Sequence, residues 1–261
     1  VAGFGGYAAF APMLAARLAG VPTVLHEQNA IAGMSNRILG RLARRICLSL
    51  PGTEGFDASR TVLTGNPVRA AVVALAGRQH DFSGKRLLVM GGSLGAHALN
   101  VHVCRHLDAL RAAGIEVRHQ TGVRDEAVTR EAYAAAGYDP ACVSAFIDDM
   151  ASAYAWADLV LCRAGATTVA ELCAAGLPSV LVPFPYAVHD HQTRNAQALV
   201  AEGAALMLPE ARMESDGLMA QVTDLLQDTG RLRSRAAAAS GCARVRAAEL
   251  VAAELETVCA R

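Results

Sequence analysis

The sequence predicts an α/β protein built from two doubly wound parallel sheets, of which the first is incomplete. Three observations predict this class. Short apolar runs alternate with longer helical periods, and a polar, aperiodic segment at 76–85 divides that pattern in two. Strands separated by helices of this length form βαβ units with right-handed crossovers. The composition, 53% hydrophobic and 18% charged over 261 residues, supports a large core and argues against disorder.

Residues 1–76 show this pattern in shortened form. The expected elements are strands at 23–26, 46–50 and 62–63 and a helix at 34–43. These make up roughly half of a doubly wound domain. The chain also starts without Met on a glycine turn, so we expect residues 1–76 to be the remnant of an N-terminal domain.

Residues 77–230 carry the pattern in full and are expected to form a second domain. The expected strands are 87–91, 116–120, 143–147, 159–162, 179–183 and 206–208, and the expected helices are 96–113, 125–136, 150–157, 168–175 and 192–202. The tail at 231–261 is rich in Ala and Arg, is helical in pattern and has no strand after it. We expect this tail to pack back on the first domain.

Charge and cysteine usage exclude several classes of protein. Lys+Arg and Asp+Glu are both 24, so bulk charge gives no support for nucleic-acid binding. The seven cysteines form no C-x-x-C pair, which predicts reduced thiols and no zinc site or other metal.

The charge-free stretch at 1–16 is interrupted by Gly and Pro and is shorter than the ~20 apolar residues that span a bilayer. It also has no basic leader typical of a signal peptide.

The strongest local signal is the run Gly91-Gly92-Ser93-Leu94-Gly95-Ala96 between an expected strand and helix. Glycines let backbone N–H groups approach an anion, and the helix N-terminus adds partial positive charge. The run is neither a dinucleotide fingerprint nor a P-loop. The alternative is a tight turn in which Ser93 caps the helix.

A second signal, 163–171, also lies between a strand and a helix. Small residues leave room for a ligand, Thr167 and Thr168 offer donors to a phosphate, and Glu171 can accept from the vicinal hydroxyls of a ribose. The alternative is a Thr-capped helix with a carboxylate favoured by the helix dipole. Two such loops in one parallel sheet favour a nucleotide-sugar site at a switch point.

Other polar segments have a binding and a structural interpretation. His191 with Gln192 opens a helix, the run 26–29 follows a strand, and Arg69 follows a proline; each is either a site residue or ordinary polar surface. Asp148 and Asp149 predict a helix cap rather than a metal pair. Four arginines are expected to cluster on a helix, as either a solvated face or a contact with anionic lipid heads: Arg37, Arg41, Arg44 and Arg45.

Seven segments, in order, closely resemble the MurG family, the bacterial N-acetylglucosaminyltransferases of glycosyltransferase family 28. They are Gly3-Phe4-Gly5-Gly6-Tyr7, 26–29 with Ala32-Gly33, Gly65-Asn66-Pro67-Val68-Arg69, 91–96 with Asn100, Phe146-Ile147-Asp148-Asp149-Met150, 163–171, and His191-Gln192 with Asn195-Ala196. The resemblance covers nearly the whole chain.

This resemblance implies the GT-B fold, with two Rossmann-like domains facing across a cleft. It also implies inverting transfer of N-acetylglucosamine from UDP-N-acetylglucosamine to the muramyl 4-hydroxyl of lipid I, giving lipid II in peptidoglycan synthesis. Carried over by motif, Ile147 would hold uracil by its backbone, Glu171 the ribose, Ser93 with the Thr167–Thr168 helix start the diphosphate, and Gln192 the sugar. The full implied donor set is Asn29, Arg69, Ser93, Ile147, Ala166, Thr167, Thr168, Val169, Ala170, Glu171 and Gln192.

The family usually has about a hundred further residues ahead of Gly3, with a loop linked to the acceptor and the base. His26 and Glu27 are the only local candidates for that base. The expected partners are the lipid-linked muramyl-pentapeptide, the inner face of the bacterial plasma membrane and other cell-wall synthesis proteins, with no cofactor. Two alternatives stay open: another UDP-N-acetylglucosamine enzyme of this fold, such as a 2-epimerase, and a non-catalytic nucleotide-sugar-binding protein.

Overall fold

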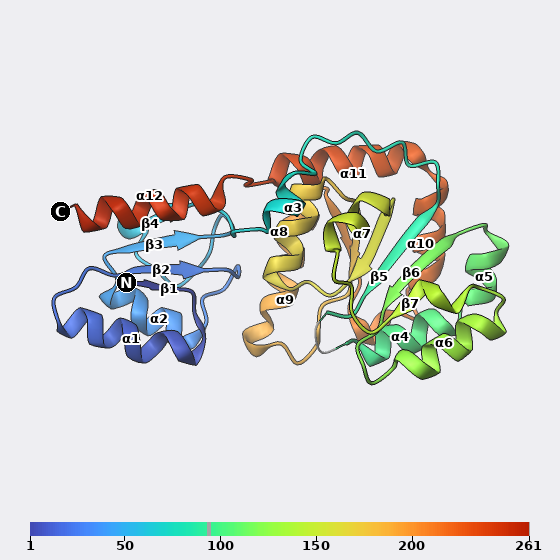
Figure 1. The fold of residues 1–261 in the computed structure, drawn as a ribbon, viewed down its shortest axis with the longest axis horizontal. Coiled ribbons are helices and arrows are strands. Elements are labelled where there is room, and N and C mark those ends of the chain that lie inside the picture. Colours follow the sequence, from blue (N-terminus) through green and yellow to red (C-terminus); the bar gives the residue numbers. More distant parts are fainter. Residues whose placement is uncertain (93–94, 261) are drawn as a thin grey trace.

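The computed structural model describes residues 1–92 and 95–260, which form two lobes, each built on one parallel sheet (Figure 1). The first sheet has the order β1-β2-β3-β4, with β1 Ala2–Gly3, β2 Val24–Glu27, β3 Arg45–Leu48 and β4 Thr61–Leu63. Helices α1 (Gly6–Leu18) and α2 (Met34–Leu42) cover one face, and the C-terminal helix α12 (Ala247–Cys259) covers the other (Figure 1). A short 3-10 helix, η1 (Ala58–Arg60), precedes β4.

Alternate residues of the first sheet face the two helical layers. Leu25 packs with Met13 and Leu39 on the side of α1 and α2, whereas Val24 packs with Val251 on the side of α12. Strands that are buried on both faces are apolar along their length rather than alternating. The first lobe is therefore completed by a helix from the far end of the chain.

The second sheet has the order β10-β9-β8-β5-β6-β7, and all its pairs are parallel. Its strands are β5 Arg86–Met90, β6 Glu116–Gln120, β7 Val143–Ser144, β8 Leu159–Cys162, β9 Ser179–Leu181 and β10 Ala205–Met207. Its helices are α3 Ala70–Val73, α4 His97–Cys104, α5 Leu107–Ala112, α6 Glu126–Ala135, α7 Met150–Trp156, α8 Ala166–Ala175, α9 His191–Ala201, α10 Leu218–Gln227 and α11 Thr229–Cys242, with 3-10 turns η2 Pro140–Cys142, η3 Val188–Asp190 and η4 Glu210–Arg212.

The strand order reverses at β5. The chain runs outward from β5 through β6 to β7, returns to β8 on the other side of β5, and continues to β9 and β10. In open α/β sheets, ligands bind beyond the carboxyl ends of the strands at such a switch point. The topology therefore predicts a ligand site at the loops after β5 and β8.

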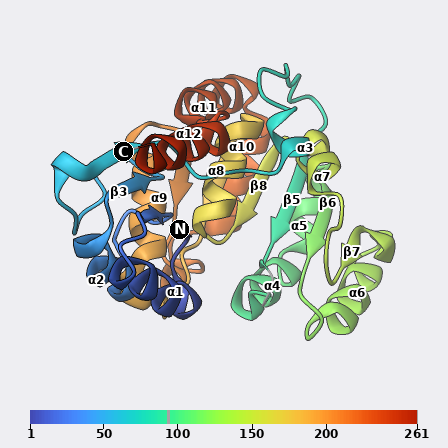
Figure 2. The same ribbon diagram turned by 60° about the vertical axis from the view of Figure 1, so that its left-hand side comes forward.

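Helix α11 leads directly into α12, which crosses from the second lobe to the first (Figures 1 and 2). Arg45 on β3 donates to Glu254 on α12 at 2.7 Å, and Val251 and Val258 pack on the sheet. The two lobes are thus joined both by the segment between β4 and β5 and by this returning helix.

The clearest departures from the expected elements are one broken helix and one shortened strand. The helix expected at 96–113 is broken into α4 and α5, and the His106 ring at the break donates from Nδ1 to the carbonyl of His102 at 2.8 Å. The strand expected at 143–147 is only β7, because pairing with β6 stops at Ser144. Helices α1 and α10 were not expected from the sequence, since the glycines and Pro12 obscured the helical period of α1.

Within the part of the chain that the structure describes, every helix is too short or too polar to cross a bilayer.

Candidate functional site

The two loops singled out in the sequence begin side by side. Met90, the last residue of β5, pairs with Cys162, the last residue of β8, so Gly91 and Arg163 leave the sheet at neighbouring positions. Both loops then enter a helix, α4 and α8 respectively. The topology therefore joins two segments that lie some seventy residues apart in the sequence.

The described part of the glycine loop is shaped by β6. The N–H of Gly91 donates to the Gln120 carbonyl at 3.1 Å, and the N–H of Gly92 donates to Gln120 Oε1 at 3.0 Å. Gly95 has φ +74, and a Cβ there would meet the Thr121 carbonyl oxygen at 2.5 Å. Gly95 is therefore needed for the close approach to Thr121, which follows β6, and the amides of Gly91 and Gly92 are already used. Ser93, predicted to contact the diphosphate, lies outside the described residues.

A buried polar network supports the start of α4. Asn100 donates from Nδ2 to the Thr121 carbonyl at 3.0 Å and to Asp125 at 2.8 Å. His119 donates from Nε2 to Asn100 Oδ1 at 3.1 Å and accepts at Nδ1 from the Tyr133 hydroxyl at 3.0 Å. Burial lowers the pKa of His119 to about 3, so the ring is neutral and this donor–acceptor pattern is fixed.

The start of α8 presents free backbone donors at the switch point. The N-cap is Gly165, which has no side-chain cap. The N–H groups of Ala166, Thr167 and Thr168 lie in the first turn, where an α-helix supplies no acceptor. A helix N-terminus of this kind attracts anions through these donors and through the helix dipole.

Glu171 lies one turn further along α8 and is almost fully buried. Its Oε1 accepts from Arg69 Nη2 at 2.8 Å and from Nε at 3.1 Å, and its Oε2 accepts from the Tyr154 hydroxyl at 2.9 Å. Burial, followed by the adjacent Glu171, raises the pKa of Tyr154. Tyr154 thus holds the Glu171 carboxylate from the protein interior. Arg69, whose side chain is 56% exposed, contacts it from the solvent side.

Asn195 on α9 connects the two lobes. Its Oδ1 accepts from the N–H of Ala30 at 2.9 Å, and its Nδ2 donates to Asn29 Oδ1 and to the Ala164 carbonyl, both at 3.1 Å. Asn195 is completely buried. One amide therefore fixes the loop after β2 against the loop after β8, and this contact accounts for the position of Asn29.

Gln192 and Ile147 also lie around this edge of the second sheet. Gln192 Oε1 accepts from the N–H of Ala164 at 3.2 Å and from the N–H of Phe184 at 2.9 Å. Ile147 is partly buried against the cluster that includes Met90 and Tyr154. Gln192 therefore lies at the loop after β8, whereas Ile147 lies beside β6, β7 and α7.

His26 and Glu27 lie in the interior of the first lobe. His26 Nε2 donates to the Gly65 carbonyl at 2.9 Å, and burial lowers the pKa of its ring. Glu27 accepts from both the N–H and the side chain of Asn29 and from Asn36 Nδ2 at 2.7 Å. Both residues hold the loop after β2 in place.

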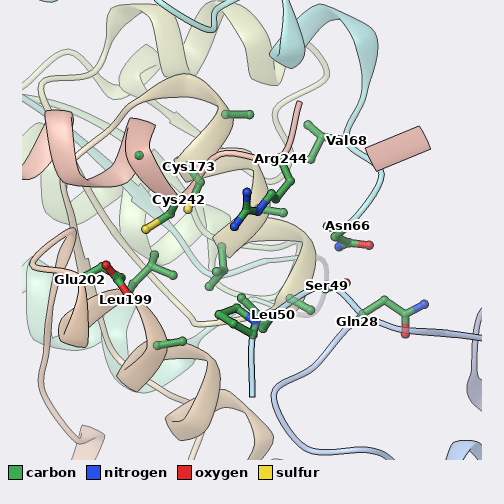
Figure 3. Close-up of a pocket in the computed structure, with 18 of the residues that line it drawn as sticks. Gln28, Ser49, Leu50, Asn66, Val68, Cys173, Leu199, Glu202, Cys242 and Arg244 are labelled. Atoms are coloured by element: carbon green, nitrogen blue, oxygen red, sulfur yellow. The ribbon is translucent and has the colours of Figure 1, made fainter. Parts of the chain in front are cut away.

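A cavity of about 360 Å³ lies between the lobes (Figure 3), and Glu171 is not among the residues that line it. It is lined by Gln28 and Asn66 from the first lobe and by Val169 and Ala170 from α8. The thiols of Cys173 and Cys242 lie next to each other in its wall, and the hydrogen bond between them raises the pKa of Cys173 and lowers that of Cys242.

Three residues that shape this site had no assigned role in the sequence. Asn195 is spaced three residues from Gln192 and so shares its helix face, which is a signal that could have identified it. Gln120 ends a strand with a polar side chain, which is a weaker signal. Tyr154 lies within an apolar helix, and nothing local distinguishes it from a core aromatic residue.

The chain matches the domains of one known protein family. Residues 86–251 match the glycosyltransferase family 28 C-terminal domain, and residues 1–48 match the N-terminal domain of the same family. A Nitratidesulfovibrio vulgaris protein named UDP-N-acetylglucosamine--N-acetylmuramyl-(pentapeptide) pyrophosphoryl-undecaprenol N-acetylglucosamine transferase is 54% identical over 96% of this chain and 70% of its own length.

Solved structures extend the comparison. The crystal structure of Acinetobacter baumannii MurG superposes with a TM-score of 0.80 at 39% identity, covering 98% of this chain and 74% of that one. A Neisseria meningitidis UDP-GlcNAc 2-epimerase bound to UDP-GlcNAc superposes with a TM-score of 0.70 at 13% identity, covering 98% of this chain and 75% of that one. The second likeness concerns the fold alone.

Proposed function

The chain belongs to glycosyltransferase family 28, and we propose that it transfers N-acetylglucosamine from UDP-N-acetylglucosamine to the muramyl 4-hydroxyl of a lipid-linked pentapeptide, with inversion at the anomeric carbon. The observation that carries the proposal is the pairing of β5 with β8, which sets the uncapped start of α8 beside the glycine loop, with buried Glu171 one turn along α8. The named transferases at about half identity support the reaction class.

We assign the diphosphate to the start of α8. The first-turn amides of Ala166, Thr167 and Thr168 and the two threonine hydroxyls supply donors without a metal ion. Ser93 remains assigned to the same group from the sequence alone. Glu171 would take the ribose hydroxyls, with Val169 and Ala170 spacing it from the helix start.

A ligand on Glu171 must share the carboxylate with Arg69 or displace it. Arg69 holds Oε1 through two N–H groups, and its exposed side chain is free to turn toward a diphosphate. Binding of the donor would replace the ion pair between Arg69 and Glu171 with an ion pair between Arg69 and the diphosphate. We therefore assign Arg69 and Glu171 to the donor as one unit.

In the transfer step, the acceptor hydroxyl attacks the anomeric carbon as UDP departs. Negative charge grows on the leaving diphosphate, and preoriented backbone donors stabilise that charge most strongly where water is excluded. Such donors contribute up to a few kcal/mol each in other enzymes. Gln192 and Asn29, at the lobe interface, are assigned to the sugar end of the donor, and Ile147 to the base.

The group that removes the acceptor proton is not assigned. A general base must come within hydrogen-bond reach of that hydroxyl. Glu27 and His26 are buried and already hydrogen-bonded, which favours a positioning role for both.

We further propose that the outer surface of α1 and α2 rests on the cytoplasmic face of the membrane. Tyr7, Leu18 and Met34 are largely exposed there, and Arg17 and Arg41 lie at the ends of the same two helices. Apolar side chains beside basic ones bind anionic bilayer surfaces. Sedimentation with anionic vesicles, but not with neutral ones, is the expected result; equal partition with both would contradict it.

The experiment that tests the function follows radiolabelled UDP-N-acetylglucosamine with a lipid-linked muramyl-pentapeptide acceptor. Label is expected to move to the lipid fraction only when acceptor is present. Conversion of the sugar nucleotide to its C2 epimer without acceptor would instead establish the epimerase alternative. Binding of UDP-N-acetylglucosamine with neither product would establish the non-catalytic alternative.

A further inference from the structure

Two histidines and a glutamate gather at the end of α4 opposite to the glycine loop. His102 lies in the last turn of α4, His106 follows it one turn later, and Glu214 comes from the segment between η4 and α10. One potential ligand atom from each lies within 4.8 Å of the other two. None of the three belongs to the donor site described here.

The spacing between His102 and Glu214 matches that of two ligands around a tetrahedral metal ion. His102 Nδ1 lies 3.4 Å from Glu214 Oε2, which is too long for a strong hydrogen bond. Zinc lies about 2.0–2.1 Å from nitrogen and oxygen ligands, so a tetrahedral arrangement places those ligands roughly 3.3–3.4 Å apart. The two side chains are therefore already at ligand spacing.

His106 is oriented as metal-binding histidines usually are. Its Nδ1 donates to the carbonyl of His102 at 2.8 Å, which fixes the proton on that nitrogen. The lone pair is then on Nε2. A metal-bound imidazole commonly donates its other N–H to a backbone carbonyl, which sets both tautomer and ring orientation.

His102 is buried, with only 5% of the residue exposed. Its Nδ1 faces the Glu214 carboxylate, whereas its Nε2, which has no partner among the described residues, is not the nitrogen offered to the ion. Glu214, in contrast, is 74% exposed at its side chain and opens the cluster to solvent.

We propose that His102, His106 and Glu214 bind one zinc ion, with water at the fourth position. Two imidazoles and one carboxylate suit zinc better than calcium or magnesium, which prefer oxygen ligands. Cysteine spacing, which excluded a zinc site in the sequence, does not bear on a site made of histidine and carboxylate.

The ion would fasten α4 to the segment that follows η4. Glu210 in η4 pairs with Arg163, the first residue of the loop after β8. Zinc would thereby link the helix that follows the glycine loop with the segment that anchors the second loop. A ligand that binds only the folded state raises the thermal midpoint of unfolding.

The test is titration of the full chain with Zn²⁺ by calorimetry and with Co²⁺ by visible absorption. We expect one ion per chain and a tetrahedral Co²⁺ spectrum without the intense charge-transfer band that thiolate ligands produce. His106→Ala and Glu214→Gln should each weaken Zn²⁺ binding at least ~10-fold and abolish the rise in thermal midpoint.

Asp216→Asn is the matched control, because it removes a carboxylate from the same segment that pairs with Arg212 instead. It should leave Zn²⁺ affinity unchanged. Glu214 is exposed, so the Glu214→Gln variant is expected to fold even if a histidine variant does not. Absence of zinc binding, a thiolate-type cobalt spectrum, or equal affinity in Glu214→Gln and the parent chain would each overturn the proposal.

Discussion

At the scale of single residues, Glu171 is the side chain whose environment most constrains function. It accepts from Arg69 and Tyr154 while almost fully buried. We predict that Glu171→Gln lowers UDP affinity about 10- to 100-fold, because a charged hydrogen bond contributes about 1.5–3 kcal/mol. Calorimetry with UDP measures this change. Glu249→Gln, on the exposed face of α12, serves as control, and an unchanged dissociation constant for Glu171→Gln would remove the ribose assignment.

His119 makes stability depend on pH. Its pKa is about 3 in the folded chain because of burial, against about 6.5 when unfolded, so the unfolded state binds more protons between these values. The stability that the neutral His119 ring contributes is present above pH 6.5 and is lost progressively as the pH falls toward 3. Between pH 7 and 5 this one group should lower the unfolding free energy by about 2 kcal/mol.

Denaturant unfolding at pH 7 and pH 5 checks this prediction. His119→Gln lacks the titration, so its loss of unfolding free energy over that interval should be about 2 kcal/mol smaller than in the parent chain. His189→Gln removes an exposed histidine and should leave the difference in unfolding free energy between pH 7 and pH 5 as it is in the parent chain. The same pH dependence in His119→Gln as in the parent would contradict a neutral buried ring.

At the scale of elements, α12 contributes to the core of a sheet formed some two hundred residues earlier. Val251 contacts the cluster of Val24 and Cys47 and is nearly buried. Val251→Ala should lower the unfolding free energy by about 1–3 kcal/mol through lost burial and the cavity that remains. Leu250→Ala, at an exposed neighbouring position, should change it little. Equal effects of the two substitutions in denaturant titrations would mean that α12 does not pack as observed.

Two strands in the interior of the second sheet were predicted to the residue. The strands at 116–120 and 159–162 match β6 and β8 residue for residue, because short apolar or alternating runs between helical periods have few other interpretations. Elements at edges and breaks were harder. The end of β7 is decided by where its neighbour stops pairing, and the break between α4 and α5 coincides with a hydrogen bond of the His106 ring.

At the scale of the whole molecule, Asn195 determines how the lobes meet. Asn195→Ala leaves the N–H of Ala30 and the carbonyl of Ala164 without this partner, which costs about 1–3 kcal/mol when such groups stay buried. We predict faster amide exchange at Ala30 and weaker donor binding. Gln197→Ala, exposed on the same helix, is the control. Unaltered exchange at Ala30 would exclude the lobe-joining role.

The sequence by itself determined the alternation of strands and helices, the residue types at each strand end and the family, because hydrophobic period, glycine placement and motif order are local properties. Only the tertiary structure decided which strand ends are neighbours and that Arg69, Tyr154 and Glu171 form one unit. The physical reason is that strand pairing and side-chain contacts join residues distant in sequence, and no local period encodes those distances.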